Sequence, residues 1–358
     1  MPIDEDRFMR FVHISDSNIG LYDERATETE KYYQDRANAA FRSLLDVINE
    51  RQVDLLLVAG NLFGHVPSKK ELDWLDTQLM ALKNTRTIMV AGSKDYMDEN
   101  SPAATYMFRS NTAILPAGEM SNAYLEDINT CVTGMSYSSE SCVSDILSSM
   151  KPQHQGVINI LLAHGGDSNH MPIDYKKLAG AGFDYVALGY MHKSRHMIKN
   201  KMAYSGALVP WDHTENYKHG YIYGEADETG VRIGFQTVHS VDFVNVVVPV
   251  KANYGGEAVV EFLDERLSEF GTEGIYRIEL QGETMENPSP DYSQLKAKYH
   301  ISEIVDRTMP EYDLTKLYTD NSSNLLGRYI ESFNKNKDSI AGKALVYGVE
   351  ALISTGEK

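Results

Sequence analysis

Short apolar runs of strand length alternate with helical patterns through the first hundred residues. Residues 55–59 are apolar without interruption and end at a glycine, and short β-type runs occupy 11–15 and 87–91. Between these runs, apolar residues recur at helical spacing over 26–51 and again over 67–82. Buried strands that alternate with helices predict a parallel sheet with flanking helices, so the predicted fold class is α/β.

The middle of the chain predicts a second sheet. Short strands are expected at 113–115, 123–128 and 130–135, a helix at 144–150, and two strongly apolar strands at 157–163 and 185–189. The later runs alternate between apolar and polar residues, which is typical of antiparallel strands, and they lie at 203–205, 219–223 and 231–238. We expect these later runs to close the second sheet.

The pattern changes near Ser240. A β-branched strand at 242–250, a helix at 258–270 and a strand at 274–280 indicate a small α+β unit, and residues 323–353 are helical in pattern. The chain is therefore predicted to contain an α/β domain at 1–240, a small α+β domain at 241–310 and a helical C-terminal segment at 311–358.

The chain is acidic, with 51 Asp and Glu against 34 Lys and Arg and a net charge of -17 over 358 residues. This excess disfavours non-specific binding to nucleic acid, which depends on clustered basic residues. A nucleic-acid contact would need the local basic patch at 193–201, interpreted as a solvent-exposed hairpin. No apolar stretch reaches the roughly 20 residues of a membrane span. The N-terminus lacks a signal-peptide pattern, and two cysteines make no disulfide framework, which favours a cytoplasmic protein with no membrane role.

Polar residues follow five of the predicted strands. They are Asp16 with Asn18, Gly60-Asn61, Gly92-Ser93-Lys94-Asp95, His164-Gly165 and Gly189-Tyr190-Met191-His192. In open α/β sheets, ligands bind beyond the carboxyl ends of the strands. The five strand ends are therefore predicted to form one shared site.

These strand ends resemble the motifs of calcineurin-like metallophosphoesterases, and among them the SbcD-type DNA repair exonucleases. Residues 11–20 are similar to the family's first motif, Asp-x-His. The later ends follow the order of its Gly-Asp, Gly-Asn-His-Asp, His-Gly and Gly-His-x-His motifs, and residues 204–210 resemble its Ser-Gly-Ser-x-x-Pro segment. The resemblance covers about 8–240. It implies a two-sheet αββα sandwich, with a small capping domain after Ser240.

Members of this family use two metal ions, usually manganese, to activate water and hold a phosphodiester. Carried over residue by residue, the resemblance implies that Asp16, His164 and His192 stand at retained metal-ligand positions. Asp95 stands beside the position of the family's proton-handling histidine. The departures are Asn18 for a histidine, Asn61 for the bridging aspartate, Ser93 for an asparagine, Lys94 for the proton-handling histidine and Tyr190 for a histidine.

These exchanges remove charge and lone pairs from the implied metal centre. Asn61 supplies no negative charge between two cations, and protonated Lys94 has no lone pair for a metal or a proton. Tyr190 would bind a metal only as a phenolate, whose ordinary pKa is about 10. We therefore expect either no metal or one weakly bound divalent ion, and no residue is assigned as catalytic.

Three functions remain open at this point. The first is a pseudo-nuclease that has lost its two-metal centre and acts as a binding or scaffolding subunit. The second is an active manganese-dependent phosphodiesterase or DNA exonuclease with a reduced site. The third is a metal-free binder of nucleotides or DNA ends, with phosphate contacts from Lys94, Lys193 and Arg195. The resemblance also implies an SbcC-like ATPase partner and a homodimer.

Overall fold

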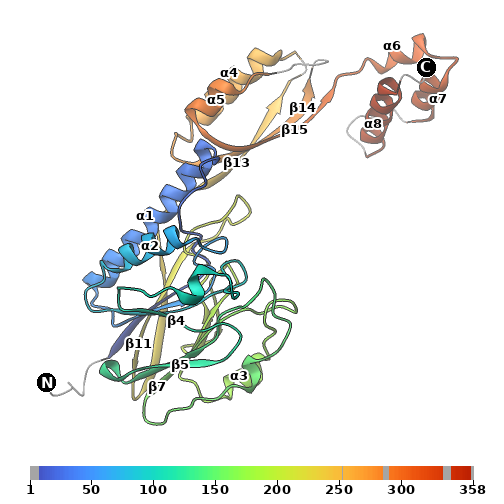
Figure 1. The fold of residues 1–358 in the computed structure, drawn as a ribbon. Coiled ribbons are helices and arrows are strands. Elements are labelled where there is room, and N and C mark those ends of the chain that lie inside the picture. The colour runs from blue at the N-terminus through green and yellow to red at the C-terminus, as the bar shows by residue number, and fades with distance from the viewer. Residues whose placement is uncertain (1–7, 252, 285–289, 334–339, 356–358) are drawn as a thin grey trace. The chain divides into compact units, whose positions relative to one another are not determined.

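The computed structural model describes residues 8–251, 253–284, 290–333 and 340–355. The chain divides into two compact units, Met1–Phe243 and Val244–Lys358 (Figure 1). The three-part division predicted from the sequence, with boundaries at 240 and 310, stays a prediction. No helix among the described residues has both the length and the apolar character needed to cross a membrane.

The first sheet has six strands in the order β12-β11-β1-β2-β3-β4. Its parallel part consists of β1 (Met9–Ile14), β2 (Leu55–Ala59), β3 (Arg86–Val90) and β4 (Thr112–Ile114). On the other side, β11 (Gly220–Asp227) pairs antiparallel with β1, and β12 (Gly230–Thr237) pairs antiparallel with β11. The expectation that 219–223 and 231–238 close the second sheet is therefore wrong. Their alternating pattern identified antiparallel strands but carried no information on which edge they join.

The second sheet also has six strands, in the order β5-β6-β7-β8-β10-β9. The strands are β5 (Ser121–Leu125), β6 (Thr130–Gly134), β7 (Ile158–His164), β8 (Tyr185–Gly189), β9 (Arg195–Ile198) and β10 (Met202–Tyr204). The run from β6 to β8 is parallel, and β10 continues it, whereas β5 and β9 pair antiparallel at the two edges. The predicted basic hairpin is formed by β9 and β10.

The two sheets pack face to face around a shared apolar core. Leu55 and Leu57 of β2 belong to the same buried cluster as Ile160 and Leu162 of β7 and Tyr185 of β8. A second cluster packs α1 (Glu28–Glu50) and α2 (Lys69–Leu79) on the outer face of the first sheet, and a third packs α3 (Tyr175–Ala179) on the second. The predicted αββα sandwich is confirmed.

Helices α1 and α2 both begin at capping boxes. The Thr27 side chain accepts from the backbone N–H of Glu30, and the Glu30 side chain accepts from that of Thr27. Ser68 and Glu71 make the same reciprocal pair at the start of α2. Such pairs satisfy backbone donors that a helix end leaves without intrahelical partners. The helix expected at 144–150 is wrong: only a 3-10 turn, Leu147–Ser149, forms there.

A histidine contacts the capping box of α2 and makes the stability of this cap depend on pH. Glu71 Oε1 lies 2.9 Å from His65 Nε2. This contact raises the pKa of His65 against the effect of burial. Burial would raise the pKa of Glu71, but hydrogen bonds from His65 and Ser68 lower it to about 2.

We therefore expect His65→Gln to destabilise the protein in a pH-dependent way. A histidine with a raised pKa stabilises the fold fully below its unfolded value of about 6.5, and this is lost as the pH rises through the folded value. Because the ring is half exposed, the loss should be about 0.5 kcal/mol at pH 5.5 and vanish by pH 9, as measured by denaturant unfolding. The exposed His196→Gln is the control, and an equal loss at both pH values would contradict the assignment.

The second unit contains a three-stranded sheet in the order β13-β14-β15. Its strands are β13 (Phe243–Val250), β14 (Ile275–Thr284) and β15 (His300–Pro310), and its helices are α4 (Gly256–Ser268) and α5 (Ser293–Lys298). Val259 and Leu263 of α4 and Leu295 of α5 pack on one face of this sheet. The sequence predicted β13, α4 and β14 but missed α5 and β15, whose charged positions interrupt the apolar pattern.

Three further helices end the chain: α6 (Leu314–Asp320), α7 (Leu325–Ser332) and α8 (Ile340–Ser354). They share a small apolar cluster that includes Leu314, Leu326, Ile330, Leu345 and Val349. The predicted helical pattern at 323–353 corresponds to α7 and α8.

Candidate functional site

The ends of β1 and β2 are tied together by their backbones. The N–H groups of Asp16 and Ser17 donate to the carbonyls of Gly60 and Asn61, each at 3.0 Å. Asp16 and Asn61 both have positive φ, at 49° and 51°, which is uncommon for residues other than glycine. β8 also approaches this point, since a Cβ added to Gly189 would lie 1.8 Å from the carbonyl oxygen of Ala59. Strand ends from both sheets therefore converge, as predicted.

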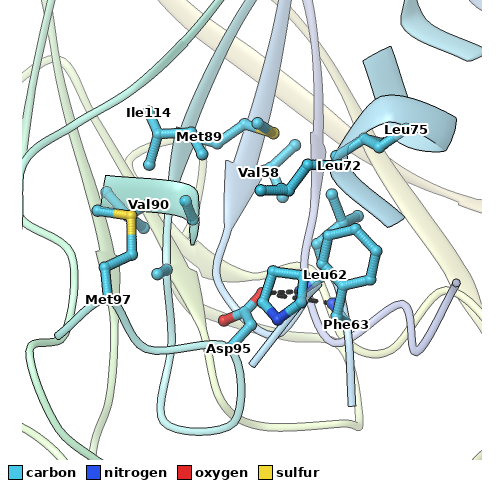
Figure 2. A pocket seen from close by; sticks show the side chains of 13 residues that line it. Val58, Leu62, Phe63, Leu72, Leu75, Met89, Val90, Asp95, Met97 and Ile114 are labelled. Atoms are coloured by element: carbon cyan, nitrogen blue, oxygen red, sulfur yellow. Dashed lines mark hydrogen bonds between the residues drawn. The ribbon is translucent and has the colours of Figure 1, made fainter. Parts of the chain in front are cut away.

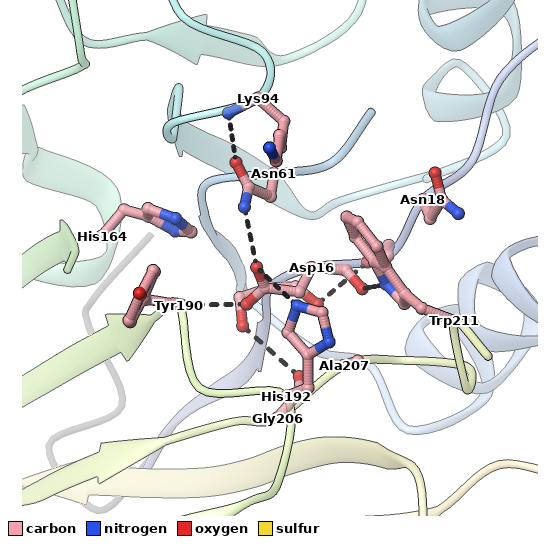
Figure 3. Close-up of polar contacts among 12 residues, drawn as sticks. Asp16, Asn18, Asn61, Lys94, His164, Tyr190, His192, Gly206, Ala207 and Trp211 are labelled. Carbon is pink, nitrogen blue, oxygen red and sulfur yellow. Dashed lines mark hydrogen bonds and ion pairs between the residues drawn. The ribbon is translucent and has the colours of Figure 1, made fainter. Parts of the chain in front are cut away.

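Asp16 is at the centre of this convergence and is fully buried. Its Oδ1 accepts from Nδ2 of Asn61 at 3.0 Å, and its Oδ2 accepts from the backbone N–H of Tyr190 at 2.9 Å. Both carboxylate oxygens are thus hydrogen-bonded to protein donors (Figure 3).

Asn61 lies between Asp16 and Lys94, as Figure 3 shows. Its Oδ1 accepts from the backbone N–H of Lys94 at 2.9 Å, which fixes the orientation of the amide. Nδ2 is then the atom that faces Asp16. A carboxylate at position 61 would instead place a negative oxygen about as close to the Asp16 carboxylate, and the two charges would repel unless a cation or a proton lay between them.

His164 is anchored through one of its two ring nitrogens. Its Nδ1 lies 2.9 Å from the carbonyl oxygen of Ala59, so Nδ1 carries the proton and donates. Its Nε2 is buried and has no hydrogen-bond partner among the described residues. A Cβ on Gly92 would lie 2.9 Å from Cδ2 of His164, which shows how closely the β3 end packs against the ring.

His192 is held by two residues that the sequence did not identify, Glu215 and Trp211. His192 Nδ1 hydrogen-bonds to Glu215 Oε1, and its Nε2 lies 3.8 Å from Oδ1 of Asp16. The indole of Trp211 lies against the imidazole at 4.6 Å between ring centroids, and its Nε1 donates to the Asp16 carbonyl at 2.8 Å. Trp211 directly follows the Ser-Gly-x-x-x-Pro segment, which was the only available signal for either residue.

The charge on Glu215 is expected to control the protonation of His192. Burial lowers the pKa of His192, but Glu215, Asp16 and Asp212 together raise it above its ordinary value. Glu215→Gln removes the nearest carboxylate, so the pKa of His192 should fall. An NMR titration of the His192 ring protons measures this shift, with the exposed Glu228→Gln as control. An unchanged titration would show that Glu215 does not set this pKa.

Tyr190 is turned toward the second sheet, away from Asp16. Its hydroxyl donates to Asp167 Oδ2, and its ring stacks on His170 at 4.9 Å between centroids. Burial and the Asp167 carboxylate raise the pKa of Tyr190 to about 12, which keeps the phenol protonated. Its φ of 109° is strained for a residue with a side chain. Sequence reasoning missed Asp167 and His170, which lie in an irregular loop after β7.

The remaining predicted residues are divided between the site and its surroundings. Asn18 donates to the hydroxyl of Tyr33 at 3.0 Å, and Figure 3 shows it apart from Asp16. Ser93, which precedes Lys94 in the loop after β3, is buried. Lys94 extends to Glu140, with Nζ 3.7 Å from Oε1. The phosphate-contact candidates Lys193 and Arg195 are exposed on the basic hairpin, and Lys193 Nζ lies 5.6 Å from the centre of the Tyr217 ring.

Asp95 holds the loops that carry Asn61 and Lys94 in place. Its Oδ1 accepts from the N–H groups of Asn61 and Gly92, and its Oδ2 accepts from those of Leu62 and Phe63. The carboxylate thereby joins the loops after β2 and β3. Asp95 also lines an apolar cavity of about 30 Å³, which is too small for a ligand larger than water. Figure 2 shows its side chain among the lining residues, near Leu62 and Phe63.

Comparison with known proteins agrees with this geometry. Residues 9–244 match the calcineurin-like phosphoesterase family. The chain belongs to this family. The DNA double-strand break repair protein Mre11 of Methanocaldococcus jannaschii is 26% identical over 275 residues, which cover 70% of this chain and 72% of that protein. GAP50, the anchor in the inner membrane complex of Plasmodium, is similar at 12% identity and a TM-score of 0.37, over 65% of this chain and 88% of that one.

The family's name implies a metal, but the donor atoms of this site do not fit a two-metal centre. Both oxygens of Asp16 accept from protein donors, and position 61 presents an N–H group to Asp16 where a bridging carboxylate would be needed. The hydroxyl of Tyr190 points to Asp167. Within the described parts of the chain, no group of three or more His, Cys, Asp and Glu residues is arranged to hold a metal ion.

Proposed function

We propose that this protein is a non-catalytic member of the phosphoesterase family, a pseudo-nuclease that acts as a binding or scaffolding subunit. The observation that supports it is the Asn61 amide, which donates to Asp16 and accepts from Lys94. In this arrangement the amide N–H donates to the one carboxylate present, at a position where a second carboxylate would need a cation between the two. The Asp16 site is thereby satisfied by the protein itself.

The test is metal analysis and an activity assay on the full chain purified with manganese supplied. We expect at most one loosely held ion per chain. Hydrolysis of a generic phosphodiester and of linear DNA should not exceed that of Asp16→Ala. Two tightly bound ions, together with manganese-dependent turnover that Asp16→Ala abolishes, would overturn the proposal.

The alternative, a reduced metal site, has one specific observation in its favour. The Nε2 atom of His164 is buried without a partner among the described residues, and an imidazole nitrogen is a common metal ligand. If one ion binds there, His164→Ala should remove it in the same metal analysis. Binding that survives His164→Ala would contradict this alternative, because the ion would then be held at a place other than His164.

A scaffolding role requires a partner, for which we propose an SbcC-like ATPase in a DNA-repair assembly, located in the cytoplasm. Support comes from the similarity to a DNA double-strand break repair protein. The C-terminal helices also expose Leu325 and Tyr347, whose relative exposures are 53% and 61%. Co-purification with an SbcC-like ATPase, compared between the native chain and Leu325→Glu/Tyr347→Glu, tests this. Equal amounts of the ATPase with the native chain and with the double variant would rule out the C-terminal helices as the contact surface.

A further inference from the structure

Tyr190 connects the candidate site to a loop of the second sheet. Its backbone N–H donates to Oδ2 of Asp16 at 2.9 Å, as Figure 3 shows. Its side chain points the other way, where the hydroxyl donates to Asp167 and the ring stacks on His170 at 4.9 Å between centroids. One residue thus contacts both the buried carboxylate of the site and the irregular loop that follows β7.

The backbone of Tyr190 is held in an unfavourable conformation. Its φ is 109°, whereas Asp16 and Asn61, which also have positive φ, are at 49° and 51°. Values near 50° fall in the left-handed helical region that a residue with a Cβ can adopt, but 109° lies outside that region. Glycine adopts such values freely because it has no Cβ. A strained backbone of this kind persists only where the surrounding contacts hold it in place.

The contacts that hold Tyr190 come from its side chain. Asp167 Oδ1 accepts from the backbone N–H groups of Asn169 and His170 at 2.8 and 2.9 Å, and it lies 2.9 Å from Nδ1 of His170. Asp167 Oδ2 accepts from the Tyr190 hydroxyl. The side chains of Asp167 and His170 are 43% and 26% exposed, while Asp16 is fully buried. The side chain is therefore anchored close to the surface, and its N–H reaches the interior.

We propose that Tyr190 is a conformational latch between the 165–171 loop and Asp16. In the latched state, Asp167 and His170 offset the backbone strain, and the Tyr190 N–H occupies Oδ2 of Asp16. In the released state, the backbone of Tyr190 returns to negative φ, and Asp16 loses this donor. Displacement of the exposed loop is thereby transmitted to the buried carboxylate. The latch does not depend on the proposed pseudo-nuclease role, because it concerns the donors of Asp16 and not whether the site reacts.

Alanine and glycine at position 190 form a matched pair that tests the latch. Both variants lose the hydroxyl and the ring, but only Tyr190→Ala keeps the strain. Amide hydrogen exchange of the full chain, followed by NMR and corrected for intrinsic rates, reports the bond from residue 190 to Asp16. The amide at 190 should exchange at least about tenfold faster in Tyr190→Ala than in Tyr190→Gly. Equal rates, or a faster rate in the more flexible glycine variant, overturn the proposal.

A conservative variant tests the anchor of the latch without removing the ring. Tyr190→Phe loses only the hydrogen bond to Asp167, so its amide at 190 should exchange about tenfold faster than in the native chain. The Val186 N–H, which donates to the Lys201 carbonyl at 2.8 Å in the same sheet, should keep its native rate and so exclude global unfolding. Tyr175→Phe is the control, because its hydroxyl pairs with Tyr204 instead. Native exchange in Tyr190→Phe, or an equal rise in Tyr175→Phe, overturns the proposal.

Discussion

Asn61→Asp is expected to lower the free energy of unfolding by about 2–4 kcal/mol at pH 7. The new carboxylate oxygen would lie close to Oδ1 of Asp16, because Nδ2 of Asn61 is now 3.0 Å from that atom. Both residues are buried, at 4% and 0% relative exposure, so water screens the repulsion poorly. The variant therefore loses a hydrogen bond and gains an unfavourable pair of charges.

The pH dependence identifies the cause of this loss. Two adjacent buried carboxyl groups share a raised pKa, so the folded variant binds a proton that the unfolded chain releases. The deficit should shrink as the pH falls through that raised value. Asn100→Asp adds the same charge at an exposed position. It should change the free energy of unfolding by less than about 0.5 kcal/mol, both at pH 7 and at the lower pH. A deficit that does not change with pH would point to lost packing instead.

Manganese provides a second readout on the same pair of proteins. A divalent cation between Asp16 and the carboxylate introduced at position 61 would relieve the repulsion, so it should raise the melting temperature of Asn61→Asp. The native chain should show a much smaller rise, because its amide already satisfies Asp16 and any ion that it holds is bound loosely. An equal rise in both proteins would mean that the native site holds the ion as well, and would contradict the proposed pseudo-nuclease.

Asp95→Asn is expected to cost about 3–5 kcal/mol, the largest loss among the variants considered. Four backbone N–H groups converge on the two oxygens of Asp95, at 3.0 and 2.6 Å on Oδ1 and at 2.7 and 3.3 Å on Oδ2. An amide has one oxygen, so its NH₂ group would face two N–H donors and leave them unsatisfied. Chemical denaturation measures the loss.

The control for Asp95→Asn is Asp35→Asn on the exposed side of α1, which should be nearly neutral. Burial raises the pKa of Asp95 even though the surrounding N–H groups oppose this. A small effect of Asp95→Asn at pH 7 would therefore mean that the native residue is already protonated there. It would show that the loops after β2 and β3 do not depend on a charged acceptor.

The local elements of the sandwich were largely predictable because their signals are local. Apolar runs such as 55–59 identify buried strands, and Thr27 and Ser68 with an acidic residue three positions on identify helix starts. The sequence failed where pairing is not local. It placed β11 and β12 in the wrong sheet, because alternation fixes which face a strand buries but not which neighbour it joins.

In the candidate site, too, the residues with a local signal were predicted and their non-local partners were not. The sequence located Asp16, Asn61, His164 and His192 at strand ends, because parallel strands deliver polar residues to one edge. It could not identify Glu215 as the partner of His192 or Asp167 as the partner of Tyr190, since both lie in loops without a periodic pattern.

By itself, the sequence determined the α/β class, the strand ends that carry the site and the chemical identity of each altered position. Only the tertiary structure decided how those positions are used. An asparagine side chain can bind a metal, donate a hydrogen bond or accept one, and the amino-acid sequence reads the same in each case. The backbone N–H of Lys94 on one side and the Asp16 carboxylate on the other fix the orientation of the Asn61 amide. That orientation arises from contacts between three different strand ends, which no local pattern encodes.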